Sequence, residues 1–203
     1  KLNSKSKILD IGCGRGKILG SLSSKLRLEK KPLGIDLIRH KDKDKRIKFK
    51  KINASSFFLT NKNKFELILI KQTIHLLKLK EIKRLLSLAK KNLSQNGKIL
   101  ILTLDADKNE LPTFKLMRTR LNKSLKRDKR ILKLIKKLHS YKKSKFIFKV
   151  KISKKEYLKM IQKRFISTLL PFTKLEIQKG MNEINHKYKE KIKFNDKLIS
   201  IIL

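Results

Sequence analysis

The chain contains 203 residues, of which 39% are hydrophobic, and this length suits about one to two domains. That is enough apolar material for one sizeable core, so a wholly disordered chain is excluded. The single cysteine, Cys13, excludes an internal disulfide framework and a zinc site built from cysteines. The longest apolar runs, 99–102 and 199–203, are far shorter than the ~20 residues of a membrane-spanning helix.

The N-terminal residues show no secretory signal pattern. We therefore expect a cytoplasmic protein. The chain begins with Lys1 and not with Met, so we expect a fragment or a processed product, from which a targeting segment could have been lost. The sequence leaves the oligomeric state open.

The chain is strongly basic, with 56 Lys and Arg against 16 Asp and Glu, a net charge of +40. Residues 1–107 carry +18, whereas the much shorter segment 108–164 carries +19. One explanation is an AT-rich coding sequence, because the chain has 46 Lys and 25 Ile but 3 Ala and 1 Val. The other is a surface that binds nucleic acid by releasing counterions. We favour the first, because aromatic residues make up 6% of the chain and no RNA-binding signature is present.

The first half of the chain alternates strand patterns with helix patterns. Apolar runs or alternation predict strands, and apolar residues at helical spacing predict helices. The predicted strands are 7–11, 32–37, 47–52, 65–70 and 98–104, and the predicted helices are about 16–28 and 79–93. Asn96-Gly97 predicts a turn before the last of these strands. The order favours an α/β fold with a Rossmann-like, mainly parallel sheet covered by helices on both faces.

The pattern changes after Asp105. We predict helices at about 110–128 and over the stripe 131–138, a strand over the alternating residues 146–152, and helices at about 154–168 and 173–188. The last two begin with capping-box spacing, Ser153 to Glu156 and Thr173 to Glu176. Residues 198–203 predict a seventh strand, antiparallel at the sheet edge. We expect a single domain, 1–203, in which the helical segments 108–128 and 154–188 form a lid.

A glycine-rich stretch, Asp10-Ile-Gly12-Cys-Gly14-Arg-Gly16, lies between the first strand and the first helix. Glycines allow a sharp turn and let a ligand approach the backbone closely. The spacing does not match the dinucleotide fingerprint G-x-G-x-x-G, because Lys17 stands at its last position. A carboxylate at Asp10 would oppose a diphosphate but attract a cation. A cofactor with an ammonium and a sulfonium, and no phosphate, fits this loop better.

A second acidic residue, Asp36, ends the second predicted strand, 20 residues after Gly16. At this distance a carboxylate reaches ribose hydroxyls in nucleotide-binding folds. The glycines alone are weak evidence, but together with Asp10, Asp36 and the strand–helix order they form a specific pattern.

These residues resemble the class I S-adenosylmethionine-dependent methyltransferases, in particular the small-molecule enzymes typified by the ubiquinone/menaquinone and biotin pathways. The resemblance covers nearly the whole chain. The matching segments are 8–17 (glycine motif), 33–37 (ribose strand), 52–54 (adenine side), 65–76 (fourth strand and its exit) and 93–104 (fifth strand). The segments 164–167 and 172–184 look like the helical lid of some members.

The resemblance implies S-adenosylmethionine as the cofactor and assigns residues to its parts. Gly12, Gly14 and Gly16 would pass under the methionine, Asp10 would support the loop and the amine, Asp36 would accept the ribose hydroxyls and Leu37 would pack on adenine. Asn53, followed by Ala54, stands where the family usually has an acid, and its side-chain oxygen could still accept from the adenine amine. Lys71 would face the cofactor mainly through its backbone.

Each of these residues also has a structural explanation. Asp10 could brace the loop, Asp36 could cap a turn, and Asn53 could be a plain turn residue. We interpret Cys13 as a small loop residue and not as a nucleophile. The remaining histidines, His40, His139 and His186, show no metal-ligand spacing.

The acceptor side has two candidates. His75 is the histidine near the expected site and could orient or deprotonate an acceptor, since its reference pKa is ~6.5. Arg164 could hold an anionic acceptor from the lid. Methyl transfer from a sulfonium needs chiefly alignment and exclusion of water, and Lys71-Gln-Thr-Ile replaces the Asn/Asp-Pro-Pro-aromatic run of enzymes that methylate exocyclic amines.

We therefore predict an enzyme that methylates oxygen, carbon or nitrogen of a small-molecule acceptor by in-line displacement. Two alternatives remain open. One is an RNA methyltransferase that uses the basic segment 108–164. The other is a non-catalytic module that keeps the fold and binds the cofactor poorly.

Overall fold

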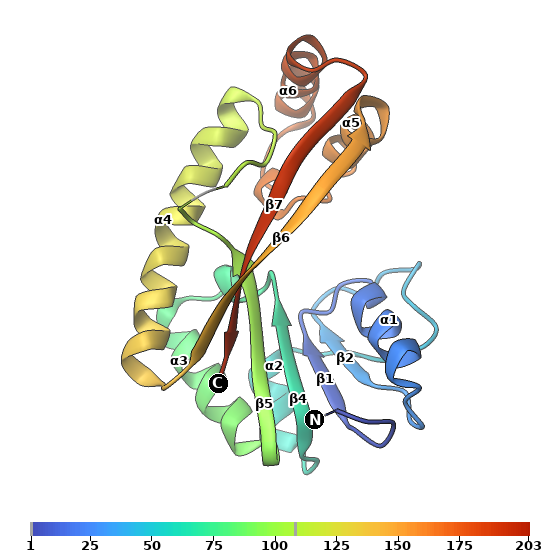
Figure 1. The fold of residues 1–203 in the computed structure, drawn as a ribbon, viewed down its shortest axis with the longest axis vertical. Coiled ribbons are helices and arrows are strands. Elements are labelled where there is room, and N and C mark those ends of the chain that lie inside the picture. Colours follow the sequence, from blue (N-terminus) through green and yellow to red (C-terminus); the bar gives the residue numbers. More distant parts are fainter. Residues whose placement is uncertain (1, 108) are drawn as a thin grey trace. The chain divides into compact units, whose positions relative to one another are not determined.

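The computed structural model describes residues 2–107 and 109–203 (Figure 1). These residues form two compact units. The first contains 2–103, 134–144 and 200–203, and the second contains 104–107, 109–133 and 145–199. Among the described residues, no helix is long and apolar enough to cross a membrane.

The described residues contain one seven-stranded sheet with the order β3-β2-β1-β4-β5-β7-β6. The strands are β1 (Ile8–Ile11), β2 (Leu33–Asp36), β3 (Lys48–Lys51), β4 (Phe65–Lys71), β5 (Leu93–Leu104), β6 (Lys142–Ser153) and β7 (Lys191–Ile202). The helices are α1 (Lys17–Leu26), α2 (Ala54–Thr60), α3 (Leu79–Lys91), α4 (Lys115–Leu138), α5 (Lys154–Gln162) and α6 (Lys174–Lys187), with 3₁₀ turns at Ile74–Leu76 and Ser167–Leu169.

The strands β1 to β5 are parallel, as the alternation of strand and helix patterns predicts. Leu9 of β1, for example, pairs with Leu33 of β2 and Ile68 of β4. The last strand runs antiparallel, because Ile99 and Leu203 exchange backbone hydrogen bonds at 3.1 and 3.0 Å. The Rossmann-like fold and the antiparallel last strand are thus confirmed. Its predicted place at the edge is wrong, because β6 lies beyond β7.

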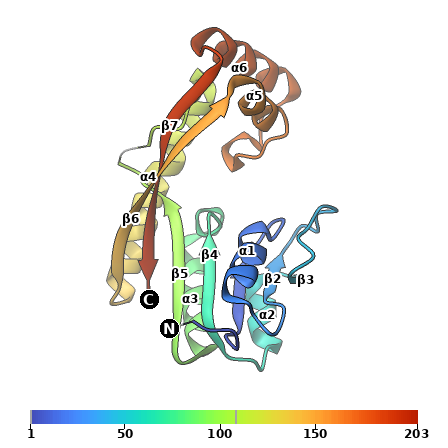
Figure 2. The same ribbon diagram turned by 45° about the vertical axis from the view of Figure 1, so that its right-hand side comes forward.

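Helices cover both faces of the sheet in the first unit (Figures 1 and 2). Ile8 and Leu67 point to one face, where Leu19 of α1 joins their buried cluster. The helices α2 and α3 contact each other, and the apolar side of α3 is buried at Ile82, Leu85, Leu86 and Ala89. Strand β4 is apolar on both faces for this reason, since a parallel sheet inside two helical layers has no solvent-facing side.

The Asn96-Gly97 pair does not form the predicted turn. Strand β5 begins at Leu93, and its pairing with β4 shifts between Phe65–Leu93 and Leu67–Lys98. A Cβ on Gly97 would lie 2.5 Å from the Phe65 carbonyl oxygen. The two residues therefore sit in an irregularity of the strand, where glycine allows the neighbouring backbone to approach.

Three other elements differ from the sequence prediction. The short helix α2 begins shortly after β3, in a segment for which the sequence predicted no element. The two helices expected at 110–128 and 131–138 form one helix, α4, of 24 residues. The helix expected at 154–168 ends at Gln162 and is followed by a separate 3₁₀ turn.

The second unit has its own apolar core, formed by α5, α6 and neighbouring segments. Its buried residues are Phe114, Met117, Tyr157, Ile161, Leu169, Phe172, Ile177, Ile184 and Ile192. Both predicted capping boxes are present: Ser153 Oγ accepts from the Glu156 N–H, and Thr173 Oγ1 accepts from the Glu176 N–H, each at 3.2 Å. These caps set where α5 and α6 begin.

Candidate functional site

The loop between β1 and α1 is held against the end of β2 by backbone hydrogen bonds. The N–H groups of Gly12 and Cys13 both donate to the Ile35 carbonyl, at 2.9 and 3.1 Å. Gly12, Gly14 and Gly16 all have positive φ, at 71°, 53° and 70°. Residues with a side chain rarely adopt this conformation, so the glycines make the tight turn possible.

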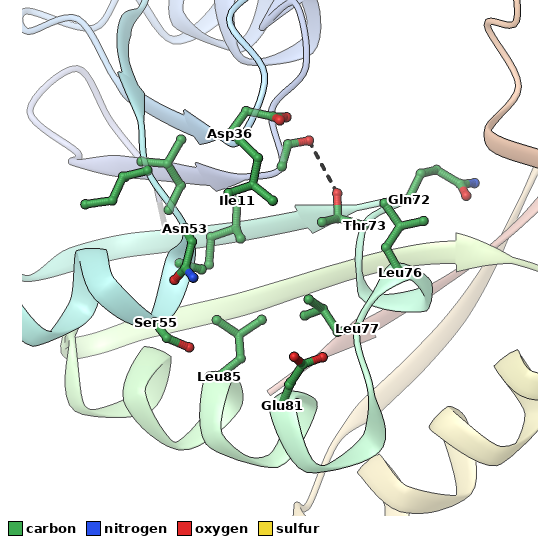
Figure 3. Close-up of a pocket in the computed structure, with 15 residues that line it drawn as sticks. Ile11, Asp36, Asn53, Ser55, Gln72, Thr73, Leu76, Leu77, Glu81 and Leu85 are labelled. Carbon is green, nitrogen blue, oxygen red and sulfur yellow. Dashed lines mark hydrogen bonds between the residues drawn. The ribbon is translucent and has the colours of Figure 1, made fainter. Parts of the chain in front are cut away.

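The first two glycines face different surroundings. A Cβ on Gly12 would lie 2.3 Å from Thr73 Oγ1, so the loop packs directly on the segment after β4. Thr73 Oγ1 also donates to the Gly12 carbonyl at 3.3 Å (Figure 3). A Cβ on Gly14, by contrast, would meet no atom of the described residues within 4 Å. Gly12 is needed for packing, whereas Gly14 borders open space.

Asp36, the last residue of β2, links the loop to the strand end. Its Oδ2 accepts from the Gly14 N–H at 2.8 Å, and its Oδ1 accepts from the Ile38 N–H at 3.0 Å. The turn-capping role is therefore real. A carboxylate can accept about four hydrogen bonds, so each oxygen of this half-buried group keeps capacity for a ligand hydroxyl.

Asp10 is a buried acid beside the same loop. Its side chain is 5% exposed, and none of the described residues donates a hydrogen bond to its carboxylate. Burial raises the pKa of Asp10 to about 7; the Lys71 ammonium opposes this rise, and the Asp36 carboxylate adds to it. A buried acid without a hydrogen-bond donor is costly, and a cationic ligand group would relieve that cost.

The neighbouring thiol responds to the same surroundings. Burial and the charges of Asp10 and Asp36 raise the pKa of Cys13 to about 12. The thiolate is the nucleophilic form of cysteine. Cys13 is thus a small packing residue, as expected, and a Cβ on Gly34 would lie 2.7 Å from its Sγ.

A cavity of about 380 Å³ opens at the carboxyl ends of β1, β2 and β4, within the first unit (Figure 3). Five residues predicted from the sequence line it: Gly12, Asp36, Leu37, Asn53 and Ala54. The other lining residues were not predicted: Ile11, Ile35, Ile52, Ser55, Gln72, Thr73, Leu76, Leu77, Glu81 and Leu85. The size and the apolar lining with few polar groups are typical of small-molecule sites.

Asn53 has a structural task that changes its predicted role. It is the N-cap of α2, and its Oδ1 accepts from the Ser56 N–H at 2.9 Å. The oxygen expected to accept from adenine is thus engaged by the helix. The amide nitrogen, a donor, and one remaining lone pair of Oδ1 are left for a ligand.

Glu81 brings a second carboxylate to the cavity from α3 (Figure 3). Its Oε2 accepts from the Lys78 N–H at 2.6 Å, which caps the start of α3 from the Glu81 side alone, because a lysine side chain cannot accept in return. Sequence reasoning missed Glu81, because Lys78 stands where the capping-box signature has Ser or Thr.

The remaining predicted residues do not line the cavity; they are Asp10, Gly14, Gly16, Lys71, His75 and Arg164. The Lys71 ammonium lowers the pKa of Asp10, and the Lys71 carbonyl accepts from Thr73 Oγ1 at 3.0 Å. His75 lies in the 3₁₀ turn just before the lining residues Leu76 and Leu77. Arg164 belongs to the second unit, where its Nη1 donates to the Leu170 carbonyl at 3.3 Å. The described residues contain no group of three or more acidic, His or Cys side chains that could hold a metal ion.

Comparisons with known proteins identify the family to which the chain belongs. A family model described as a methyltransferase domain matches residues 2–164. The chain belongs to this family of class I, S-adenosylmethionine-dependent methyltransferases. A comparison with curated proteins finds no match.

Solved structures share the fold of this methyltransferase at low sequence identity. A candidate methyltransferase from an antibiotic biosynthesis pathway of Anabaena variabilis is 14% identical, with a TM-score of 0.67 over 98% of this chain and 91% of that one. A methyltransferase from Geobacter sulfurreducens in complex with S-adenosylhomocysteine is 15% identical, with a TM-score of 0.58 over 100% and 86%. A similar complex from Thiobacillus denitrificans is 14% identical, with the same TM-score and coverage.

The two glycines provide a matched test of the loop. Gly12→Ala would place a methyl group inside the Thr73 side chain, whereas Gly14→Ala adds backbone strain alone. We expect Gly14→Ala to cost about 1 kcal/mol of unfolding free energy and Gly12→Ala to cost clearly more. Urea denaturation of both variants measures this difference. Equal losses would contradict the close contact between Gly12 and Thr73.

Proposed function

We propose that this methyltransferase transfers a methyl group from S-adenosylmethionine to a small-molecule acceptor by in-line displacement. The observation that carries the proposal is the cavity at the carboxyl ends of β1, β2 and β4, with Asp36 at its rim and an apolar wall formed by Leu76, Leu77 and Leu85. In open α/β sheets, ligands bind in the crevice outside these strand ends. Solved relatives of the same fold are complexes with S-adenosylhomocysteine, the demethylated form of this cofactor.

The residues present fit this cofactor. Asp10 offers a buried, unpaired carboxylate for the amine. Asp36 keeps free acceptor capacity for the ribose hydroxyls. The open side of Gly14 leaves room for the methionine part next to the backbone. Leu37 and Ala54 provide apolar surface for the adenine ring.

When bound, S-adenosylmethionine supplies a methyl group on a sulfonium, which is a good leaving group. The chain's contribution is to align the reactants and to exclude water, which can account for a large part of the rate. The backbone of the Gly12–Gly16 loop positions the ligand, and the apolar side chains Leu76, Leu77 and Leu85 keep the cavity dry.

Two acceptor-side assignments complete the proposal. His75, next to the lining residues of the 3₁₀ turn, is proposed to orient the acceptor. Arg164 is proposed to bind an acidic group of the acceptor, and the segments 108–128 and 154–188 are proposed as the lid of a single methyltransferase domain.

Binding of S-adenosylmethionine to Asp36→Ala tests the central assignment. We expect affinity about 100-fold lower or worse, because the change removes a charged acceptor for two hydroxyls and the anchor of the Gly14 N–H. Isothermal titration calorimetry measures the affinity. Glu29→Ala is the control, since it removes an exposed carboxylate that accepts from Ser4 Oγ and does not line the cavity, and it should bind normally.

If Asp36→Ala and the wild type bind equally, the assignment of Asp36 is wrong. If the wild type itself shows no binding, the chain is a non-catalytic module with this fold. A wild type that binds is then incubated with methyl-labelled cofactor and a set of metabolites. Labelling of a small molecule supports the proposed acceptor class.

Cofactor affinity should depend on pH through Asp10. Its pKa of about 7 in the free protein means that the carboxyl is mostly neutral at lower pH. The ionised form attracts the cofactor amine, so we expect affinity to rise about tenfold from about pH 6 to about pH 8. Calorimetry across this range should also detect proton release on binding below pH 7. Asp10→Asn should lack both effects; an unchanged pH profile in this variant would assign the dependence to another group.

Asn53→Asp should strengthen cofactor binding. One carboxylate oxygen can keep the α2 cap, now made by Oδ1 of Asn53, while the other accepts from the adenine amine. One added hydrogen bond to a charged group corresponds to an affinity gain of about tenfold. Asn53→Ser keeps a capping oxygen but offers no second acceptor, so it should show no gain. Weaker binding by Asn53→Asp would show that the amide donates to the ligand.

A further inference from the structure

The edge strand β6 exposes apolar and basic side chains in the second unit. The alternation of residues 146–152 predicts a half-buried strand, yet Phe146 and Phe148 are 47% and 55% exposed and Ile147 is 61% exposed. Figures 1 and 2 show β6 beside β7, at the end of the strand order. The same strand carries the exposed lysines Lys149 and Lys151.

Next to these residues lies a groove of about 590 Å³ between β6 and α5. Val150 and Ile152 form its apolar floor on the strand side. Phe165, which is 51% exposed, lies at the other side. Lys151, Lys159 and Lys163 also line the groove. The groove therefore combines an accessible aromatic ring with three ammonium groups.

The nearby acids do not neutralise these lysines. Among the described residues, none forms an ion pair with Lys149, Lys151, Lys159 or Lys163. Glu156, the acid in the groove, is engaged in the capping box of α5. Asp105 pairs with Lys145. The surface formed by 145–151, 159, 163 and 165, which we call the β6 surface, is thus left with uncompensated positive charge.

We propose that the β6 surface binds single-stranded nucleic acid. Proteins that bind single strands combine a positively charged groove, which follows the phosphates, with aromatic side chains on which bases stack. Phe146 and Phe148 lie two residues apart on one side of the strand, at a spacing of about 6.6–6.8 Å, so each can take its own base. By the alternation of the strand, Lys149 lies on the side opposite the two rings, where a phosphate backbone can pass, and Lys151 lines the groove.

Other occupants fit less well. A second copy of the chain would place lysines against lysines across the strand edge, which is unfavourable. A flat anionic membrane could reach the phenylalanine side or the lysine side of β6, but not both. A duplex hides its base faces and leaves Phe146 and Phe148 without partners. A flexible single strand can contact both sides, and this binding does not depend on the proposed small-molecule acceptor.

Fluorescence anisotropy of a labelled 12-nucleotide single-stranded oligouridylate, titrated with the full chain at several salt concentrations, tests the proposal. Phe146→Ala/Phe148→Ala should weaken binding by about fivefold or more for each ring, with an unchanged salt dependence. Lys149→Gln/Lys151→Gln should lower the slope of log affinity against log salt by about 1.4. All these side chains are exposed, so the variants should keep the wild-type circular dichroism.

Two matched controls separate a site from general charge. Lys30→Gln/Lys62→Gln removes two exposed lysines of the first unit, and Leu59→Ala removes an apolar side chain that is 66% exposed. Both should bind as the wild type does. The bound oligonucleotide should also protect Lys149 and Lys151 of the unmodified protein from acetylation, which Lys30 should not show.

Several results would overturn the proposal. One is an equal fall in salt slope for the two lysine pairs, which indicates diffuse attraction. Another is full affinity in the phenylalanine variant, which excludes stacking. Equal affinity for duplex RNA, or tighter binding of polyglutamate or phosphatidylserine vesicles through the same residues, would assign the surface to a different partner. None of these results affects the calorimetry of S-adenosylmethionine, so the two proposals fail separately.

Discussion

The site depends on the hydrogen bonds that fasten the glycine loop to the end of β2. The Gly12 and Cys13 N–H groups converge on the Ile35 carbonyl, and the Gly14 N–H reaches the Asp36 carboxylate. These bonds follow from the parallel register, in which Ile11 pairs with Ile35, so that the chain leaving β1 meets the strand end of β2. Positive φ at the glycines lets the backbone turn its N–H groups inward there.

Asp36 therefore stabilises the fold in addition to its proposed role in binding a ligand. Asp36 stabilises the loop and the turn at Ile38 while leaving acceptor positions open. Asn53 shows the same overlap, because its oxygen begins α2 at the cavity wall. The structural and functional explanations of such residues are thus not exclusive. In Asn53 they meet at one atom, because the cap uses one of the two lone pairs of the oxygen that a ligand would use.

The sequence was sufficient for the part of the site that local motifs encode. Gly12 and Asp36 are recognisable by their spacing from strand ends, the Asn53-Ala54 pair is recognisable by the family resemblance, and all line the cavity. The wall after β4 was indicated as a segment, through the family resemblance of 65–76, but its lining residues were not identified. The place of residues 72–77 depends on a 3₁₀ turn and on Thr73 packing against Gly12.

The fold shows the same division between local and tertiary signals. Buried strands such as β4 were predicted because a short, continuous apolar run is typical of a strand that is covered on both faces of a parallel sheet. Asn-Gly pairs are typical of turns, but Asn96 and Gly97 lie in an irregularity of β5, where its pairing with β4 shifts. The alternation in β6 correctly predicts a strand but not its exposure, because the position of a strand in the sheet order is a tertiary property.

Two buried acids show that a raised pKa points to a binding site only at certain places in the fold. Asp10 and Asp128 are 5% and 3% exposed, and burial raises their pKa values to about 7 and about 6. Asp128 lies inside the long helix α4, and its Oδ1 has no hydrogen-bond partner among the described residues. The backbone N–H groups of the helix are engaged in its own hydrogen bonds and are not available to this oxygen.

Asp10 has equal burial but different neighbours. It lies at the carboxyl end of a parallel strand, next to a loop of glycines, and the charges of Lys71 and Asp36 both act on its pKa. At such strand ends the sheet leaves a crevice in which a ligand can bind. A buried charge is expensive in either place, and at the end of β1 the proposed binding of the cofactor amine would offset that cost. The crevice at the strand ends, and not burial itself, is what separates a binding carboxylate from a destabilising one.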